Sequence, residues 1–533
     1  MNSWMAQVAA KHLGEMFSGA QAAHAAGDLT TAERRYREVL ELDSRHADAL
    51  HMLGVVKMQV GQFDAAADLI SRAVAINGTV PSFHSNLAFA LGEIGRPAEA
   101  IEHYQRAVQI APDFNDARFN LGLELHKAGR FEDALPHLGW VTARSPGDAE
   151  AHRNLGHVLY NLRRLDEAEA AYRQVTRINA QDAHAHYSLG CVLHEMRRLD
   201  EARAALAEAI DLEPAMAVAS YRLCLLELLA GNYDAGWKLH EWRWRAVPSL
   251  QRFGSDRPEW GGEPVAGKTV FLWPEQGFGD VIQFARFASE VAKLGARVML
   301  GCPAPLERIM RTVPGVDRVV TSADDLPAFD LHLPLLSVPL LLGTTLETLP
   351  CIVPYLRADG GRWQKGIAGR TGLKVGIVWA GEARASHAAW AAVDQRRSTS
   401  LTDWLPVLSV SGCSFFSLQK GGASAIAVEL PPDLRPVDLM GDVSDFADTA
   451  GIIANLDLVI AVDTAVAHLA GGMGKPVWIL SRFDGCWRWL LDREDSPWYP
   501  TARIFRQTVP GDWAGVMQRV ATALTEAAAA SGI

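Results

Sequence analysis

The sequence has no excess of positive charge. Its 51 lysines and arginines are outnumbered by 62 aspartates and glutamates, which gives a formal net charge of -11. A chain with this balance is not broadly attracted to phosphate backbones or to anionic lipid surfaces. We therefore expect no nucleic acid partner.

Long apolar runs and paired cysteines are also missing. The most apolar stretch, residues 331–342, holds two prolines and one histidine and is shorter than the roughly 20 residues of a membrane-spanning helix. No basic segment precedes a hydrophobic one near the N-terminus, so no signal peptide is expected. The six cysteines form no CxxC pair, which is typical of reduced thiols and predicts no structural zinc. These absences favour a cytoplasmic protein without a membrane span.

A period of 34 residues dominates the first half of the chain. Leucine recurs at this interval, and the residue after it is small, which allows close contact between helices. A second register carries alanine, with a glycine or an arginine five residues earlier at the expected turn between paired helices, where glycine adopts positive φ at little cost. The leucines are Leu53, Leu87, Leu121, Leu155, Leu189 and Leu223, and the turn residues are Gly27, Gly61, Gly95, Gly129, Arg163 and Arg197.

This pattern resembles the tetratricopeptide repeat (TPR) family over residues 13–250, as six full repeats and a degraded seventh. The resemblance implies a superhelix of stacked helix pairs whose concave groove binds a peptide or protein segment. The alternative is an array that serves only as a scaffold or an oligomerisation surface. Tyr36, Tyr104 and Tyr172 share one register and are expected to pack in the core. Residues 251–266 form the predicted junction, and nearby tryptophans would seal the last repeat against the next domain.

After residue 267 short β-branched runs alternate with glycine-rich turns and helical segments, which is typical of α/β folds. Two series of strands predict two Rossmann-like lobes, residues 267–358 and 373–525. The predicted fold class is therefore α + α/β, a helical solenoid followed by a two-lobed module. Ligands of open parallel sheets bind beyond the carboxyl ends of the strands. The predicted strands are 269–273, 297–300, 316–320, 373–379, 414–418, 456–462 and 476–480.

The loop after the first strand contains Gln276, Gly277, Gly279 and Asp280. Its glycines let the backbone approach a ligand, and we expect Asp280 to begin the helix that follows. An aspartate at that position is also an ordinary helix cap, so the alternative role of Asp280 is structural.

Two loops of the second lobe carry residues suited to a phosphate group. Gln419 and Lys420 follow one strand, where a lysine can neutralise a diphosphate as a point charge. Asp463 and Thr464 follow another and lead into a helix whose free N–H groups attract phosphate. His468 lies four residues after Thr464 and shares its helix face. A solvated lysine and an ordinary cap are the alternatives.

Three segments, residues 273–284, 416–421 and 459–480, resemble the TPR-linked bacterial glycosyltransferases and, more remotely, the heptosyltransferases of lipopolysaccharide synthesis. The resemblance covers most of residues 265–525. It implies a GT-B fold and inverting transfer from a nucleotide-sugar donor, which is a substrate, with no separate cofactor.

The resemblance to heptosyltransferases also assigns roles to individual residues. Asp280 matches the aspartate proposed as base on the first lobe. Asp463, Thr464 and His468 match the segment of the second lobe that binds the donor. Ala465 departs from the pattern, because it stands where that segment has a glycine.

The order of domains is similar to that of the nucleocytoplasmic O-linked N-acetylglucosamine transferase, whose phosphate-binding lysine Lys420 would match, and to that of flagellin glycosyltransferases. The sequence has no Asp-x-Asp motif at a strand end, so we predict no metal. Lys420, a helix terminus and Arg396 or Arg397 would then meet the charge of the diphosphate. The segment 487–489 would cover the base or the sugar, or pack in the cleft wall.

The leading hypothesis is a glycosyltransferase that moves a sugar to a hydroxyl of a protein, with flagellin as a candidate, held by the TPR groove. The alternative is an interaction scaffold whose GT-B module binds ligand without catalysis. Transfer to a lipid-linked glycan is a third hypothesis. If Asp280 is only a cap, Glu275 or His387 is the next candidate base.

Overall fold

The computed structural model describes residues 2–381 and 388–530. It divides into two compact units, Met1–Val192 and Leu193–Ile533. The boundary falls inside helix α11 (Ala183–Glu195), so the predicted TPR range 13–250 crosses it. The last helical pairs therefore belong to the unit that contains the sheets.

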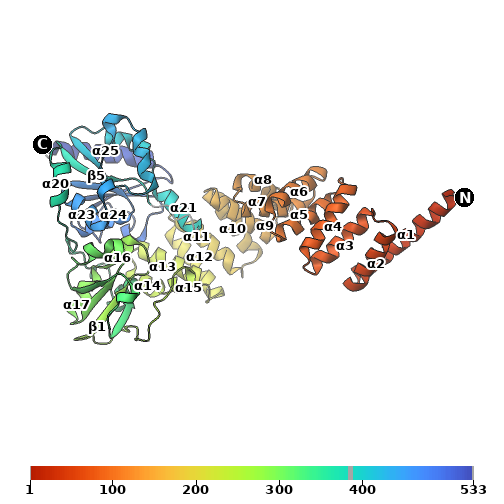
Figure 1. The fold of residues 1–533 in the computed structure, drawn as a ribbon, viewed down its shortest axis with the longest axis horizontal. Coiled ribbons are helices and arrows are strands. Elements are labelled where there is room, and N and C mark those ends of the chain that lie inside the picture. Colours follow the sequence, from red (N-terminus) through yellow and green to blue (C-terminus); the bar gives the residue numbers. More distant parts are fainter. Residues whose placement is uncertain (1, 382–387, 531–533) are drawn as a thin grey trace. The chain divides into compact units, whose positions relative to one another are not determined.

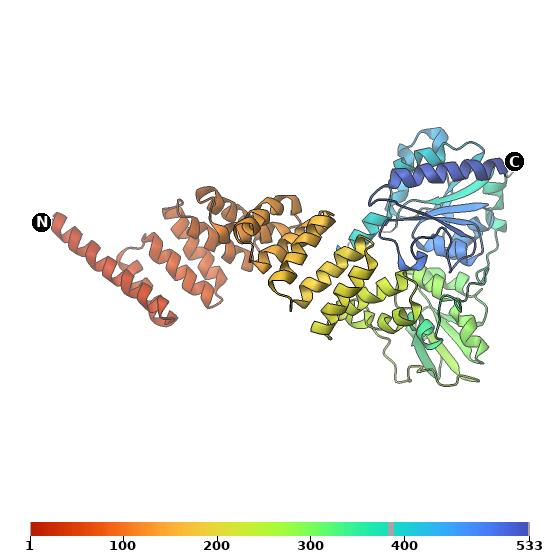
Figure 2. The same cartoon turned by 180° about the vertical axis from the view of Figure 1, so that it is seen from behind.

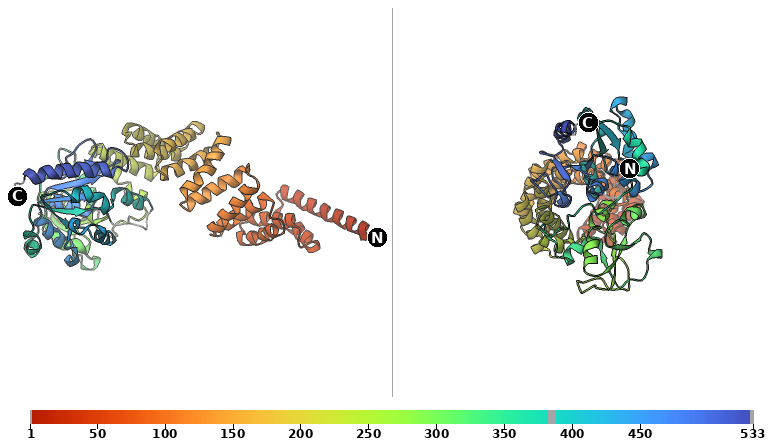
Figure 3. Two further views of the ribbon diagram at one scale, coloured as in Figure 1. Left: turned by 90° about the horizontal axis from the view of Figure 1, so that it is seen from above. Right: turned by 90° about the vertical axis from the view of Figure 1, so that its left-hand side faces the viewer.

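The first unit is a series of helix pairs (Figures 1 and 3), as the 34-residue period predicts. From α2 onward its helices alternate between 14 and 13 residues. The predicted helical solenoid is confirmed. The helices are α1 (Asn2–Ala25), α2 (Leu29–Leu42), α3 (Ala47–Gln59), α4 (Phe63–Ile76), α5 (Pro81–Glu93), α6 (Pro97–Ile110), α7 (Asn115–Lys127), α8 (Phe131–Arg144), α9 (Ala149–Asn161) and α10 (Leu165–Ile178).

The turns and contacts of the pairs follow the sequence registers. The turn glycines have positive φ, and Arg163 and Arg197, which replace glycine in two repeats, are held there too, at φ 61° and 62°. A Cβ atom at Gly156 would lie 2.7 Å from Cε1 of Tyr172, so only glycine allows this approach. The tyrosines of the shared register, Tyr36, Tyr104 and Tyr172, are buried core residues.

The second unit begins with the last repeats and continues into a four-stranded parallel sheet of order β3-β2-β1-β4. Helices α16 and α17 cover one face of this sheet, where Val270 and Leu272 pack. Trp244 and Phe253 pack on the other face against Phe271. The elements are α12 (Leu199–Leu212), α13 (Ala217–Leu229), α14 (Tyr233–His240), α15 (Arg243–Ala246), β1 (Thr269–Trp273), α16 (Phe278–Phe284), α17 (Phe287–Lys293), β2 (Arg297–Gly301), α18 (Glu307–Met310), β3 (Val316–Val320), β4 (Leu331–Pro334) and α19 (Val338–Leu341).

A six-stranded parallel sheet of order β10-β9-β8-β5-β6-β7 follows. The C-terminal helix α25 lies along one of its faces (Figure 2), with Val516 and Val520 in the same core as Val375 and Val462. The α/β part of the predicted fold class is therefore confirmed. The elements are α20 (Gly361–Ala368), β5 (Leu373–Val378), α21 (Ala388–Arg397), α22 (Leu405–Leu408), β6 (Cys413–Ser417), β7 (Val437–Asp438), α23 (Phe446–Ala454), β8 (Leu458–Val462), α24 (Ala465–Gly472), β9 (Val477–Ser481), a 3-10 turn η8 (Trp487–Trp489), β10 (Ala502–Arg506) and α25 (Trp513–Ala530).

The last repeat packs against both lobes through Trp237. Trp237 on α14 is buried, and its Nε1 donates to the carbonyl oxygen of Thr344 at 3.0 Å. Its ring meets those of Phe284 in the first lobe and Trp487 in the second edge-on, with centroids 6.1 and 5.6 Å away. This tryptophan therefore seals the repeat end against the sheets, as the sequence predicts.

Candidate active site

The loop after β1 lies at the carboxyl end of the first sheet, beside β4. Strands β1 and β4 are neighbours in the sheet although they are far apart in sequence. This is a switch point of the sheet, the usual place for a ligand. Helix α16 begins at Phe278 with Gly277 as its N-cap, so the expectation that Asp280 begins the helix is wrong by two residues. Asp280 is the third helical residue, and its Oδ2 accepts the Gly277 N–H at 3.1 Å. Gln276 and Gly279 beside it are half-buried.

Asp280 is also paired across the lobes. Arg488, on η8, donates to Oδ1 of Asp280 and, at 2.7 Å, to Oε1 of Gln283. The guanidinium stacks 4.4 Å from the ring centre of Trp487. Although burial lowers the pKa of Arg488, the Asp280 charge raises it above its usual value. In this state the carboxylate expected to act as base is neutralised by an arginine.

The loop after β8 lies at the second switch point, between β8 and β5. Thr464 is the N-cap residue of α24, but its side chain makes no capping bond, and its buried Oγ1 has no hydrogen-bond partner among the described residues. The first N–H groups of α24 therefore lie beside an unused hydroxyl. A bound anion would satisfy both.

His468 is a supporting residue in this structure. Its side chain is 4% exposed, its Nδ1 lies 2.9 Å from the hydroxyl of Tyr499, and its ring stacks on Trp489 at 5.2 Å. Burial lowers the pKa of His468 to about 3, so the imidazole is neutral. Its contacts with Tyr499 and Trp489 hold α24 against the interior of the second lobe, and the ring does not face solvent.

The two predicted loops meet. A Cβ atom at Gly279 would lie 3.1 Å from Cδ2 of His468 and 3.6 Å from Cα of Ala465. The start of α16 in the first lobe therefore packs against the start of α24 in the second. Glycine at position 279 permits this approach, because a side chain there would push the two helix starts apart.

Arginines surround Asp463. Arg397 donates from Nη1 to the Asp463 carbonyl oxygen at 2.9 Å and pairs with Asp394 at 2.7 Å. Burial opposes ionisation of the Asp463 side chain, but the nearby charges, including Arg488 and Arg397, hold its pKa below the ordinary value. Arg396, on the same helix as Arg397, faces Asp484 at 3.4 Å instead.

Gln419 and Lys420 follow β6, as predicted, but they have different environments. Gln419 is buried, and its Oε1 accepts the backbone N–H groups of Trp379 and Ala380 at 3.2 and 3.0 Å. It therefore shapes the loop after β5. Lys420 is exposed and donates to the carbonyl oxygen of Val443 at 2.6 Å, a bond that a phosphate could replace.

Of the two fallback bases, only Glu275 lies within the part of the chain that the structure describes. Both oxygens of Glu275 accept from Arg243 of α15, at 2.7 and 3.0 Å, and one also accepts the Leu336 N–H. The Glu275 side chain is 0% exposed, so it cannot reach a substrate; the proposal of Glu275 as base is wrong. His387 lies outside the described residues.

Sequence reasoning gave little weight to Arg488 and overlooked Arg482, which lies in the same loop after β9. Arg482 donates to Asp484 at 2.9 Å and adds a further charge near Asp463. The predicted strand 476–480 was the available signal in the sequence, because a fourth loop at the end of a strand, which contains both Arg482 and Arg488, follows it.

No three histidine, cysteine, aspartate or glutamate side chains of the described chain gather as a metal site would require. Within residues 2–381 and 388–530, no helix is both long and apolar enough to cross a bilayer.

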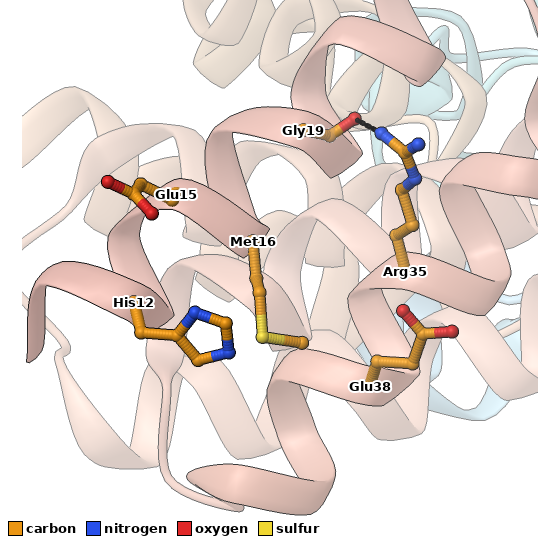
Figure 4. A pocket seen from close by; sticks show the side chains of 6 residues that line it. All are labelled: His12, Glu15, Met16, Gly19, Arg35 and Glu38. Atoms are coloured by element: carbon orange, nitrogen blue, oxygen red, sulfur yellow. Dashed lines mark hydrogen bonds between the residues drawn. The ribbon is translucent and has the colours of Figure 1, made fainter. Parts of the chain in front are cut away.

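A hollow of about 280 Å³ lies between α1 and α2 in the first unit (Figure 4). His12, Glu15 and Met16 line it from α1, while Arg35 and Glu38 line it from α2. Arg35 already donates to the Gly19 carbonyl oxygen at 2.7 Å. None of the predicted site residues lines this hollow, and we assign it no ligand.

Comparison with known sequences bears on the first half. Sequence models described as "Tetratricopeptide repeat" match residues 23–88, 81–114, 119–183 and 183–216. The chain contains TPR repeats. Arrays of this kind suggest that the chain interacts with other proteins.

One curated relative is protein FlbA of Caulobacter vibrioides, which is 29% identical over 345 residues. The match covers 59% of this chain and 56% of FlbA, so the chain spans little more than half of that relative's length.

Solved TPR structures resemble parts of the chain. The TPR protein YrrB, described as having an unusual peptide-binding site, is 22% identical, covering 34% of this chain and 95% of its own with a TM-score of 0.33. MamA of Desulfovibrio magneticus is 19% identical, covering 32% and 96%, with a TM-score of 0.31. PilF of Pseudomonas aeruginosa is 20% identical, covering 38% and 92%, with a TM-score of 0.33.

Proposed function

We propose that the chain is a glycosyltransferase that moves a sugar from a nucleotide-activated donor to a hydroxyl of a protein. The observation that carries this proposal is the meeting of two helix starts, α16 with Asp280 and α24 with Thr464, at the switch points of two parallel sheets. One supplies a carboxylate and the other supplies free N–H groups. Inverting transfer requires this combination of a base and an anion site.

The donor would bind to the second lobe. Its phosphate groups would accept from the first N–H groups of α24 and from the unpaired hydroxyl of Thr464. Lys420, exposed after β6, would add a charge-assisted hydrogen bond. Asp463 and His468 would act by holding this helix start in place, the first through Arg397 and the second through Tyr499.

The reaction would be a single displacement. The oxygen of the acceptor hydroxyl attacks the anomeric carbon and forms the new glycosidic bond, and the bond from that carbon to the phosphate oxygen breaks. The nucleotide leaves with the electron pair, while Asp280 takes the proton of the hydroxyl. Cations and N–H groups around the phosphates stabilise the charge that develops on the leaving group.

The TPR repeats would supply the protein acceptor. Stacked repeats present an extended surface that binds polypeptide segments, and flagellin is the candidate that the resemblance names. A cytoplasmic site of action, where nucleotide sugars are made available to soluble enzymes, completes the proposal.

The second candidate is a scaffold that binds nucleotide without catalysis. The pairing of Asp280 with Arg488 favours it, because the carboxylate is then occupied by a guanidinium instead of a substrate hydroxyl.

The experiment that separates the two incubates the purified chain with a panel of nucleotide sugars and measures nucleotide release. Asp280→Asn keeps the acceptor for the Gly277 N–H but cannot take a proton, so turnover is expected to fall about 10²-fold or more. Asp234→Asn, which changes a carboxylate that is 77% exposed on α14, is the matched control. Nucleotide binding without any turnover by the wild type would leave the scaffold as the better account.

A further inference from the structure

The Asp280–Arg488 ion pair joins the two lobes at the proposed donor site, so a role for it in donor binding rests on the proposed function. Both oxygens of Asp280 are in use, one by the Gly277 N–H and the other by Arg488. The two side chains are only 18% and 14% exposed. The pair is therefore a defined contact between the lobes and not a solvated surface pair.

Arg488 is placed to serve a second anion. It lies on η8, in the loop after β9, and β9 is the neighbour of β8 in the sheet. Its charge acts on Asp463, which precedes Thr464, the N-cap residue of α24. Trp487 packs along its guanidinium, which fixes the plane in which a carboxylate or a phosphate could pair with it.

In the described chain, buried polar atoms without partners occur on a residue that Arg488 contacts, on its sequence neighbour and at the start of α24. Gln283, whose Oε1 accepts from Arg488, is 0% exposed, and its Nε2 has no partner among the described residues. The same is true of Nε1 of the fully buried Trp489, next to Arg488. Thr464 adds an unpaired hydroxyl at the start of α24. Buried donors without partners are uncommon in folded proteins and point to a polar ligand at this place.

We propose that the Asp280–Arg488 pair is a latch that the phosphate groups of a nucleotide open. Arg488 leaves Asp280 to pair with the phosphates at the start of α24, and Asp280, relieved of its cation, becomes the proton acceptor. The base is thus switched on only when the donor is bound. An acceptor hydroxyl that arrives first meets a neutralised carboxylate.

The latch makes an unusual prediction about affinity, because Asp280 and the nucleotide compete for Arg488. Asp280→Asn removes the competing charge and keeps an acceptor for the Gly277 N–H, so it is expected to bind nucleotide about fivefold more tightly, the worth of a partly exposed ion pair. Arg488→Met is expected to bind about tenfold or more weakly, the loss of a charge-assisted hydrogen bond.

The experiment is isothermal titration calorimetry of the full chain with uridine, guanosine, adenosine, cytidine and thymidine diphosphates and with cytidine monophosphate. The matched control is Arg308→Gln, since Arg308 also bridges the lobes, to Asp445 at 3.1 Å, but lies 59% exposed on α18. Its affinity is expected to equal that of the wild type.

Each outcome decides a point. Tighter binding by Asp280→Asn supports the latch, and this result stands alone if Arg488→Met does not fold. Unchanged or weaker binding by Asp280→Asn overturns the latch, as does unchanged binding by a folded Arg488→Met. If neither the wild type nor Asp280→Asn binds any of the six nucleotides, the proposed function itself fails.

Discussion

Replacing Arg243 with methionine removes one side of the buried ion pair that ties the end of the repeats to the loop before Asp280. Both side chains of the Arg243–Glu275 pair are 0% exposed. Breaking such a pair by removing one partner leaves an uncompensated charge and costs about 3–5 kcal/mol. We expect Arg243→Met to lower the free energy of unfolding of the second unit by this amount.

The loss is expected to depend on pH. Burial raises the pKa of Glu275 above its ordinary value even though Arg243 acts to lower it, and removal of the guanidinium raises it further. A carboxyl group with a higher pKa in the folded state contributes stability below its unfolded pKa and loses it as the pH rises through the folded value. Arg243→Met is therefore expected to be closer to the wild type at about pH 5 than at about pH 8.

Urea unfolding followed by tryptophan fluorescence suits this measurement, because 14 of the 16 tryptophans lie after residue 193. Lys238→Met is the control: it breaks an exposed pair with Asp234 on neighbouring α14, and such pairs contribute little. Adding Glu275→Gln to Arg243→Met should recover part of the loss, because no buried charge is then left unpaired. A loss below about 1 kcal/mol in Arg243→Met, or one independent of pH, would refute the reasoning.

Three further predictions concern the proposed donor site and the TPR repeats. Lys420→Ala should weaken nucleotide binding by about 1.5 kcal/mol, the lower end for a charged hydrogen bond because Lys420 must first leave a carbonyl oxygen; unchanged affinity by calorimetry would place the pocket elsewhere. Burial lowers the pKa of His51 and His157 to about 4. The free energy of unfolding is therefore expected to decrease as the pH falls below 6.5, by about 2 kcal/mol for each histidine at pH 5, and amide hydrogen exchange in α3 and α9 should measure this decrease. Deleting residues 1–182 should leave the melting temperature of the second unit nearly unchanged, whereas deleting 1–216 should lower it, because the buried Glu227 of α13 then loses its salt bridge with Arg203; equal melting temperatures would contradict this.

Most of the fold could be predicted from the sequence, because its signals are local. A 34-residue period and short β-branched runs report which residues face a core, whatever lies far away in the chain. The errors in the predicted helix start and strands have local causes as well. Sequence preference puts aspartate at the N-cap, but Asp280 takes the third position and reaches back to Gly277, as in a capping box. Three strands went unpredicted: β4 has four residues and ends at a proline, β7 has two residues, and β10 follows an irregular segment.

The site was less predictable because its decisive contact is not local. Asp280 and Arg488 are 208 residues apart, and no pattern within either loop reveals the pairing. Residue type alone also gave no sign that Gln419 and His468 are buried, where they contact the backbone of the loop after β5 and the hydroxyl of Tyr499. Their neighbours decide their roles, and those neighbours come from other elements.

The boundary between the two units, inside α11, separates repeats whose number can change from a part of the chain whose elements depend on one another. Before it, each 34-residue repeat packs on its neighbours in the same way, so a gene duplication or loss of a whole repeat would change the length of the array and leave the second unit intact. After it, Trp237 and Arg243 are shared between the helices and the sheets. The number of repeats can therefore change by recombination among related chains, while the last repeat and the two sheets are inherited together as one block.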